Sequence, residues 1–323
     1  MKKWICRVSI VIGVCLGFLI MPKSDAGAQT IKQTVEASDG GKCTIWDIQD
    51  ALDEAQKNSE DKYEIRVPRG VYRLAGSERL HLSSNTTLIL TGVTFKRTKT
   101  SGAGAMIIVG YPRGEAGKST SPGGGYTKGG YTRGHDIKII GGTFDAGAEV
   151  RDVTTLCTFS HVKNITFDGT TFCYRPKSVN ITHMMEFGAS KNVTIKNCRF
   201  LGNQKMGEAV QIESALKNVA SSDLMGKEDG TKTSNVRIQN CIFSNFEYAF
   251  GTNHGCSRDK YTHFYICGNT FEKITKYAIC CYNYSGAVVK RNVIKKSGKK
   301  SFDSFILKLG QKNTLVQSGN KVK

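Results

Sequence analysis

After its first 28 residues the sequence lacks any further apolar run that resembles a membrane span. It also contains no pair of CxxC motifs at zinc-binding spacing, which argues against a structural zinc site. No segment combines basic and aromatic residues in the manner of nucleic-acid-binding modules, so we expect no nucleic-acid partner. These absences exclude a multispanning membrane protein, a zinc-dependent fold and a nucleic-acid-binding module.

Acidic residues are scarce relative to basic ones. Lys and Arg number 46 and Asp and Glu 27, for a formal net charge of +19. In an exported protein this excess points to polyanions such as uronic-acid polysaccharides or an anionic cell wall. From Lys290 to Lys323 the only acidic residue is Asp303. This basic C-terminal end is predicted to contact the wall or substrate, or to be a solvated end that discourages edge-to-edge stacking.

The first 28 residues are typical of a secretion signal. A basic start up to Arg7 precedes an apolar stretch from Ile10 to Met21, and small residues follow at Ala26–Ala28. We therefore expect a signal peptide over 1–28, a single mature domain over 29–323, and a secreted or cell-wall-associated protein. An uncleaved N-terminal anchor is the alternative.

The cysteines do not form a complete disulfide framework. Two of the eleven lie in the expected signal, and the nine that remain cannot all pair within one chain. Cys198 and Cys241 hold equivalent positions in successive repeats and are predicted to be buried, stacked thiols. We expect no cofactor: calcium is compatible with such a protein, but no cluster of acidic ligands supports it.

Seven segments end on an apolar anchor at a nearly constant interval. The steps between anchors are 28, 28, 43, 28, 23 and 28 residues, which indicates one unit stacked on copies of itself. Within a unit, apolar residues alternate, an Asn or Gly interrupts them, and an apolar pair resumes. This pattern predicts a parallel β-helix. The anchors are Phe144, Phe172, Phe200, Phe243, Phe271, Ile294 and Val322.

One helix and two insertions complete the predicted organisation. A helix is expected over 43–57, where Thr44 and Asp47 are spaced to cap the first turn. Such a helix can cover the open end of a β-stack. A Gly/Tyr-rich loop at 113–134 and a second insertion at 217–233 are predicted to project from one side, where loops often border a binding face.

A second family of strand-like segments, typified by 182–189 and 208–214, aligns titratable residues on one face. Rungs lie roughly 4.8 Å apart and alternate residues roughly 6.6 Å apart, so Glu186 and Glu213 are predicted to be about 8 Å apart. This lies within the roughly 6.5–9.5 Å that separates the two carboxyl groups of an inverting glycosidase. Crowding can also push the pKa values of two carboxyl groups apart.

Other polar residues surround this pair in the alignment. His183 lies opposite Glu208, and His254 follows the next strand, which offers a second set for proton transfer. An outward glutamate on a β-stack can also be a solvated residue without function, and this alternative stays open for each carboxylate taken alone. The predicted substrate-binding residues are Gln211, Asn253, Tyr282 and Asn283.

The chain resembles the pectate lyase-like superfamily of right-handed parallel β-helix proteins. The likeness lies in the segments EIRVPRGVYRL, NTTLILTGVTF, GGTFDAG and NVTIKNCRF. It implies an all-β, right-handed parallel β-helix and a polysaccharide partner. The Asp-Asp and Gly-His-Gly motifs of polygalacturonases are absent from the sequence, so the resemblance implies the fold rather than a particular pectin chemistry.

Together these features predict a secreted, monomeric protein that cleaves an acidic polysaccharide by glycoside hydrolysis. Glu186 and Glu213 would form the acid–base pair, with Glu208 and the histidines tuning them. One alternative is a polysaccharide lyase, in which His183 or His254 abstracts a proton and β-elimination follows. The other is a non-catalytic adhesin that binds a cell-surface polysaccharide.

Overall fold

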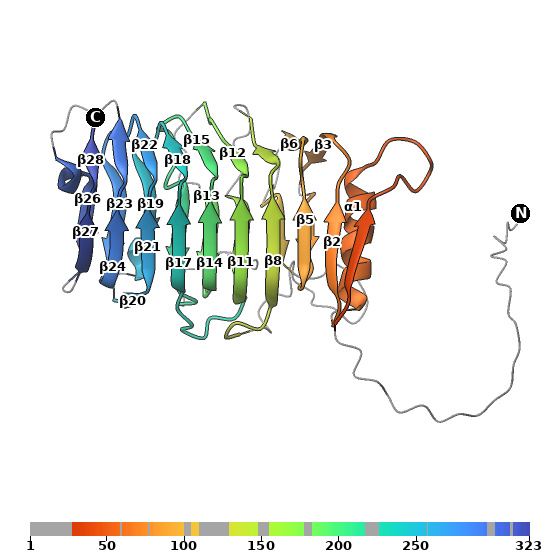
Figure 1. Cartoon of the computed structure of the whole chain (residues 1–323), viewed down its shortest axis with the longest axis horizontal. Helices are drawn as coiled ribbons and strands as arrows, with labels where there is room; N and C mark the ends of the chain where they lie inside the picture. The colour runs from red at the N-terminus through yellow and green to blue at the C-terminus, as the bar shows by residue number, and fades with distance from the viewer. Residues whose placement is uncertain are drawn as a thin grey trace, which may run out of the picture.

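The computed structural model describes residues 28–58, 60–76, 78–99, 105–109, 129–147, 155–177, 183–216, 226–256, 258–295, 301–310 and 313–323. The expected signal, apart from Ala28, and most of the Gly/Tyr-rich loop lie outside the described residues. The described strands wind into a right-handed β-helix with three parallel sheets, here called sheets A, B and C (Figure 1). The fold class predicted from the repeat is confirmed.

A typical turn of the solenoid contributes one strand to each sheet, so neighbouring strands mostly come from successive repeats. Sheet A contains β1 (Thr30–Thr34), β2 (Lys62–Arg66), β5 (Thr86–Ile89), β8 (Gly134–Ile140), β11 (Val162–Asp168), β14 (Lys191–Lys196), β17 (Ser234–Gln239), β20 (Tyr261–Thr262), β21 (Phe264–Cys267), β24 (Tyr284–Lys290) and β27 (Thr314–Ser318). Sheet B contains β3 (Gly70–Ala75), β6 (Val93–Lys99), β9 (Thr143–Asp145), β12 (Thr171–Cys173), β15 (Arg199–Leu201), β18 (Ile242–Ser244), β22 (Thr270–Glu272), β25 (Val293–Lys295) and β28 (Lys321–Val322). Sheet C contains β4 (Leu80–Leu82), β7 (Ile107–Val109), β10 (Thr155–Ser160), β13 (His183–Gly188), β16 (Val210–Glu213), β19 (Tyr248–Thr252), β23 (Tyr277–Tyr282) and β26 (Ile306–Leu309).

The helix α1 (Ile45–Lys57) begins two residues later than predicted, because Thr44 is its N-cap. The Thr44 side chain accepts a hydrogen bond from the Asp47 backbone, and the Asp47 carboxylate accepts one from the Thr44 backbone at 2.7 Å. This reciprocal capping satisfies two backbone donors that the first turn would otherwise leave free. The apolar face, with Ile48 and Leu52, is fully buried.

Helix α1 lies at the N-terminal end of the stack and covers the edge of sheet C (Figure 1). The Gln49 amide pairs with the backbone of His81 in β4 as a neighbouring strand would: Oε1 accepts from His81 N at 2.8 Å, and Nε2 donates to His81 O at 3.2 Å. Ser83 Oγ also donates to Leu52 O. An edge strand that is paired in this way no longer offers free backbone groups to another chain.

The five predicted phenylalanine anchors, preceded by Phe95, form a continuous stack of rings inside the solenoid. Ring centroids of successive phenylalanines lie 4.6–5.5 Å apart from Phe95 to Phe271, and each ring is close to parallel with the next. Phe200 and Phe243 are the closest pair, at 4.6 Å with an interplanar angle of 4°. These rings are buried, so dispersion and burial of apolar surface act in the same column at every rung.

The turn between sheets A and B uses left-handed backbone at the residues predicted to break the strands. Asn197 and Asn240 have φ of 56° and 54°, and Gly169 and Gly268 both have φ of 71°. Asn and Gly tolerate this region better than other residues. The strand breaks in the sequence are therefore sharp turns that repeat at the same corner of the solenoid.

The position after this turn carries small or hydrogen-bonding side chains that point inward. Cys198 and Cys241 occupy it in the middle rungs and are buried, as predicted. Asn269 and Asn292 occupy it in later rungs, also fully buried. The Asn269 side chain accepts from Cys241 N at 2.9 Å and donates to Asn292 Oδ1 at 3.0 Å, so the asparagines bind the rungs together from within.

Replacing Phe200 with Ala should lower the free energy of unfolding by about 3–5 kcal/mol, because it leaves a cavity between two stacked rings. Urea denaturation followed by circular dichroism measures this change. The control is Val316→Ala, since Val316 is 51% exposed. Equal losses for the two variants would mean that the ring stack contributes nothing beyond ordinary surface packing.

Candidate functional site on sheet C

The titratable residues singled out in the sequence converge on the outer face of sheet C. Its strand register matches the predicted alignment: Glu186 pairs with Gln211, Gln211 with Gly251, and Gly188 with Glu213. Because the strands are parallel and in register, one column of side chains runs along the stack beside the next. This places three carboxyl groups and a histidine on neighbouring rungs.

Glu186 and Glu213 lie closer together than predicted. The two carboxyl groups are close enough to act on each other's pKa through a direct side-chain contact, whereas rung and residue spacing predicts a separation of about 8 Å. That predicted distance holds only for side chains that stand perpendicular to the sheet. The residue paired with Glu213 is Gly188, which has no side chain and leaves space over β13 for the two carboxyl groups to meet.

This contact requires one proton shared by the pair, since two carboxylates cannot donate to each other. The Asn253 amide indicates where the proton lies. Asn253 Oδ1 accepts from Gly255 N at 2.8 Å, which leaves Nδ2 to donate to Glu213 Oε1. Glu213 Oε2 is buried and receives no conventional hydrogen bond in the described part of the chain. Oε2 is therefore the oxygen of Glu213 that is left without a hydrogen-bond donor among the described residues.

Burial and the neighbouring carboxyl act in the same direction on Glu213. Glu213 is only 1% exposed, and burial raises its pKa well above the ordinary value, with the charge of Glu186 raising it further. Burial also raises the pKa of Glu186, against an opposing effect of His183. Glu186 is the more exposed member of the pair. The pair is thus built to hold a proton above the pH at which a free carboxylic acid loses it.

His183 and Glu208 form a second contact beside this pair. His183 Nδ1 lies 3.3 Å from Glu208 Oε2 and 3.2 Å from Glu208 O. Both partners accept hydrogen bonds, so Nδ1 carries a hydrogen. The Glu208 side chain extends across Gly251, where a Cβ atom would lie 3.1 Å from Oε1. Gly251 therefore makes room for the Glu208 carboxyl group.

His254 and Tyr282 form a pair at the edge of the same face. His254 Nδ1 lies 2.7 Å from the Tyr282 hydroxyl, and the two rings meet edge to face with centroids 5.6 Å apart. His254 is exposed and Tyr282 is buried at 8% exposure. Burial raises the pKa of Tyr282. Within this pair, the His254 imidazole is therefore the group that is exposed to solvent.

The remaining predicted residues lie in different settings. Gln211 is buried between Glu186 and Gly251 in its column. Asn283, with φ of 50°, forms the turn that follows β23, and its side chain packs against Gly310. Asn283 is therefore explained by backbone geometry, as are the asparagines of other turns.

Two further residues border the cluster without having been predicted as site residues, although the strand alignment already places Cys280 in the column of Glu186 and Gly251. Thr158 pairs with Glu186 from β10, is buried and hydrogen-bonds to Thr155. Cys280 pairs with Gly251 from β23, and burial raises the pKa of its thiol, with the charge of Glu208 adding to this. The strand alignment placed Cys280 in this column, but a buried thiol next to a carboxylate does not follow from alignment alone.

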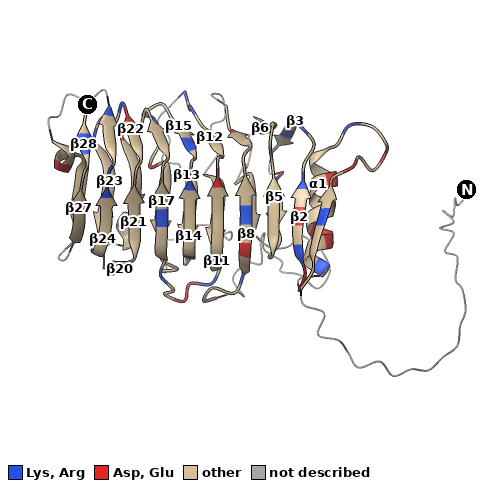
Figure 2. Ribbon diagram, viewed as in Figure 1, with Lys and Arg blue, Asp and Glu red and all other residues tan. Residues whose placement is uncertain are grey.

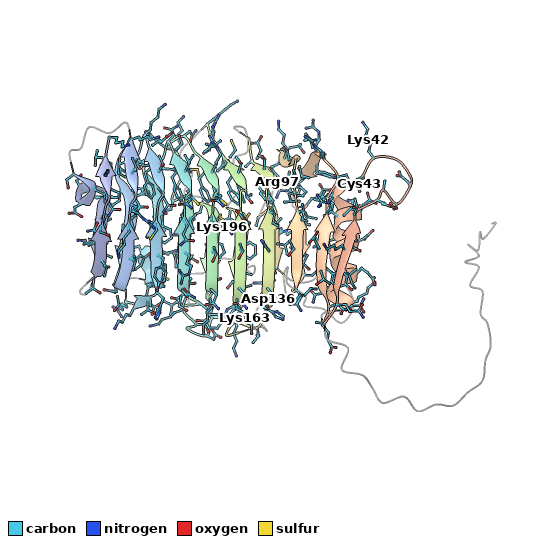
Figure 3. The ribbon with its side chains drawn as sticks, in the orientation of Figure 1. Lys42, Cys43, Arg97, Asp136, Lys163 and Lys196 are labelled. Atoms are coloured by element: carbon cyan, nitrogen blue, oxygen red, sulfur yellow. The ribbon has the colours of Figure 1, made fainter. Side chains whose placement is uncertain are left out.

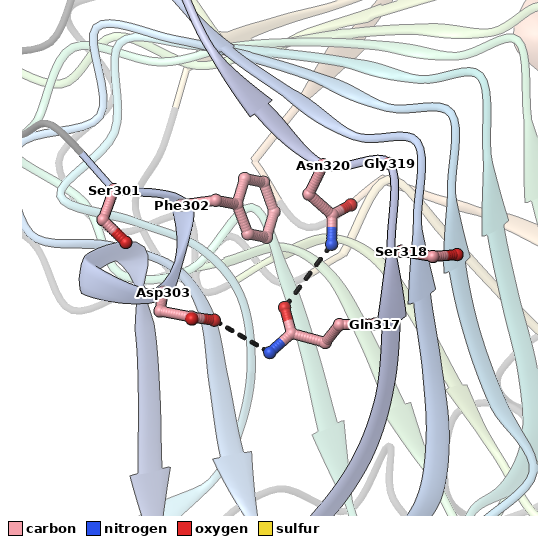
Figure 4. A pocket seen from close by; sticks show the side chains of 7 residues that line it. All are labelled: Ser301, Phe302, Asp303, Gln317, Ser318, Gly319 and Asn320. Carbon is pink, nitrogen blue, oxygen red and sulfur yellow. Dashed lines mark hydrogen bonds between the residues drawn. The ribbon is translucent and has the colours of Figure 1, made fainter.

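Two hollows at the ends of the stack lack such a cluster. The one at the C-terminal end, about 320 Å³, has Asp303 as its one carboxylate, and Gln317 Nε2 donates to it at 2.8 Å (Figure 4). The other, about 440 Å³, lies near Lys42, Arg69 and Tyr72 and has no carboxylate among its lining residues. Among the described residues no group of three or more His, Cys, Asp or Glu side chains is arranged to hold a metal ion.

No protein-family model and no curated protein matches the chain. Solved structures do: the Streptococcus pneumoniae surface protein and adhesin PfbA is 21% identical, with a TM-score of 0.62 over 82% of this chain and 67% of PfbA. A second PfbA structure gives 22% identity and a TM-score of 0.55 over 81% and 60% of the two chains.

A mutant tailspike protein of E. coli bacteriophage HK620, solved with a pentasaccharide, is 14% identical, with a TM-score of 0.51 over 92% of this chain and 57% of the tailspike. The chain thus spans about three fifths to two thirds of the length of these proteins. The chain shares the parallel β-helix fold with these proteins, as the repeat in the sequence predicted. No described helix has the length and apolar character needed to cross a membrane.

The shared proton makes stability depend on pH in a defined direction. The folded-state pKa of Glu213 is raised above its ordinary value of 4.5, so the folded chain binds a proton more tightly than the unfolded chain. Stability should therefore fall as pH rises from about 4.5 toward the folded-state pKa, by about 1.4 kcal/mol for each unit of pKa difference.

Glu213→Gln should flatten this profile: its melting temperature should match the wild type at low pH and exceed it at high pH. Melting curves between pH 4 and pH 9 measure the effect. The control is Glu64→Gln, in β2 on sheet A, which should keep the wild-type slope. A Glu213→Gln variant with an unchanged slope would show that Glu213 is ionised in the folded protein.

Proposed function

We propose that this protein binds an acidic polysaccharide along the outer face of sheet C and hydrolyses a glycosidic bond there. The observation that carries the proposal is the proton-sharing pair of Glu186 and Glu213 on a face that also holds Glu208 and His183. A carboxylic acid that stays protonated near neutral pH is what a general acid for a leaving sugar oxygen requires. Structural scaffolding alone does not call for two buried carboxyl groups in contact.

The contact changes the roles within the cluster. In this proposal Glu186 and Glu213 act on each other directly rather than across a water molecule, so they are not assigned as the separated pair of an inverting enzyme. Glu186, the more exposed of the two, is the proton donor in this proposal. Glu213 is a positioning residue that keeps the proton on the pair.

Glu208 is then the general base. Glu208 lies just before β16, one rung from β13, and its carboxyl group reaches across to Gly251, which follows Glu186 and Gln211 in the same column. A distance of roughly 6.5–9.5 Å between the Glu186 and Glu208 carboxyl groups would leave room for the water molecule that the base activates. His183 holds the Glu208 carboxylate in place through Nδ1.

The formal charge of +19 supports an anionic polymer as the substrate. Secretion and association with the cell surface follow from the expected signal and from the kind of substrate. The likeness of fold to an adhesin favours one alternative, a surface protein that binds polysaccharide without cleaving it. The lyase alternative would use His183 or His254 as the base.

Product masses distinguish these three functions. The purified protein is incubated with polygalacturonate, alginate, hyaluronate and xylan, and products are analysed by mass spectrometry. Products that have gained one water molecule per cleavage support hydrolysis, whereas unsaturated products of unchanged total mass identify a lyase. Binding to one of these polymers without any product would establish the adhesin alternative and overturn the enzymatic proposal.

Glu186→Gln should lower turnover by about 10²–10⁴-fold while binding of the polymer is retained, because general acid catalysis contributes that much. Initial rates at saturating polymer and equilibrium binding are measured on the same preparations. The control is Glu272→Gln on sheet B, which should leave both values unchanged. Full activity in Glu186→Gln would show that Glu186 is not the acid.

A further inference from the structure

The outer face of sheet A carries a strip of basic residues that the proposed reaction does not use. Sheet A follows sheet C in each turn of the solenoid, so the two outer faces are different walls of the molecule. Figure 2 shows ribbon positions of Lys or Arg on β8, β14 and β17, strands of the sheet that is turned toward the viewer. We infer that this face is a second binding surface, which holds a carboxylated polysaccharide.

The register arranges these residues in two columns. In one column Lys138, Thr166, Thr194 and Arg237 follow each other on four successive rungs. The outer two are three rungs apart, or roughly 14 Å. Two cations with two hydroxyl groups between them offer charge to carboxylates and hydrogen bonds to sugar hydroxyls.

The second column lies beside the first, toward the beginning of the strands. Lys163 and Lys191 are direct neighbours there and both are exposed. Figure 3 places Lys163 near the end of sheet A that also holds Asp136, and Lys196 farther along the strands. The strip therefore spans much of the width of the sheet as well as several rungs.

Most of the basic side chains on this face form no ion pair with a carboxylate of the described residues. The Asp136 carboxylate contacts His135 Nδ1 at 2.8 Å, and the Asp168 carboxylate contacts Lys196 Nζ at 3.1 Å. Within the described residues, Lys138, Lys163, Lys191 and Arg237 have no carboxylate partner within 4.0 Å. The face therefore attracts an anionic polymer.

Aromatic rings give the strip a feature suited to sugars. The Arg237 guanidinium lies 4.1 Å from the centroid of Tyr265, which is its neighbour on the next rung. Lys191 Nζ lies 5.7 Å from the centroid of Tyr131. Cations held on ring faces are kept extended along the surface. Rings, hydroxyl groups and regularly spaced cations match an extended, carboxylated sugar chain.

The inference is tested by binding rather than by turnover. All variants are made in the Glu186→Gln background, so that binding can be measured without cleavage. The sheet A variant carries Lys163→Gln, Lys191→Gln and Arg237→Gln. The matched control removes the same charge from the basic C-terminal end, with Lys308→Gln, Lys321→Gln and Lys323→Gln. The probe is polygalacturonate, at several salt concentrations.

The sheet A variant should bind polygalacturonate about tenfold or more weakly at low salt, with a shallower salt dependence. The reason is that three cations which would pair with carboxylates of the polymer are lost. The control should bind within about twofold of the parent. Equal weakening in both variants would show that only net charge matters, and weakening in the control alone would place binding at the C-terminal end.

Either of those outcomes overturns the inference, as does tighter binding of single-stranded DNA than of polygalacturonate. The proposed hydrolysis can fail without affecting this result, because no product is measured. Conversely, the sheet A triple variant in the otherwise native chain should retain product formation on short oligosaccharides.

Discussion

The structure depends on one constraint, the in-register pairing of parallel strands along the whole stack. Each residue then lies directly above and below residues at the same position of neighbouring repeats. Phe200 therefore meets Phe172 and Phe243, and Asn269 meets Asn292. Like residues in an inner column stabilise the fold, because their rings stack or their side-chain amides hydrogen-bond to one another from rung to rung. The same geometry decides the chemistry of the outer faces.

On sheet C the constraint brings like charges together. Glu186 lies on β13, Glu213 on the next strand β16, and Glu208 just before β16. Glu213 and His183 are buried, and the other two carboxyl groups are partly buried beside them. Two carboxyl groups in contact cannot both be ionised at a low cost, so one proton stays with the pair. The free-energy cost of these crowded carboxyl groups must be offset by the packing of the rest of the stack. A cluster that lowers stability in this way is better explained by function than by folding.

On sheet A the same constraint spreads charge of the opposite sign along a wall. Lys163 and Lys191 are stacked neighbours, and their mutual repulsion is tolerable because both are exposed to water. The outer face of sheet C thus gathers carboxyl groups that hold a proton, and the outer face of sheet A gathers lysine and arginine side chains. A long anionic polymer bound to sheet A would raise the local concentration of its own segments near the carboxyl groups of sheet C.

The sequence by itself determined the columns, because side chains in a solenoid repeat with the chain. The phenylalanine anchors, the breaks at Asn197 and Asn240, the buried Cys198 and the contact of His183 with Glu208 could all be predicted from alignment. Only the tertiary structure decided how side chains lean within a column. The contact of Glu186 with Glu213 lies beside Gly188, which has no side chain, and the orientation of the Asn253 amide is fixed by the backbone of Gly255 in the turn that follows it. Burial also sets the proton affinity of Glu213, and burial belongs to the assembled stack.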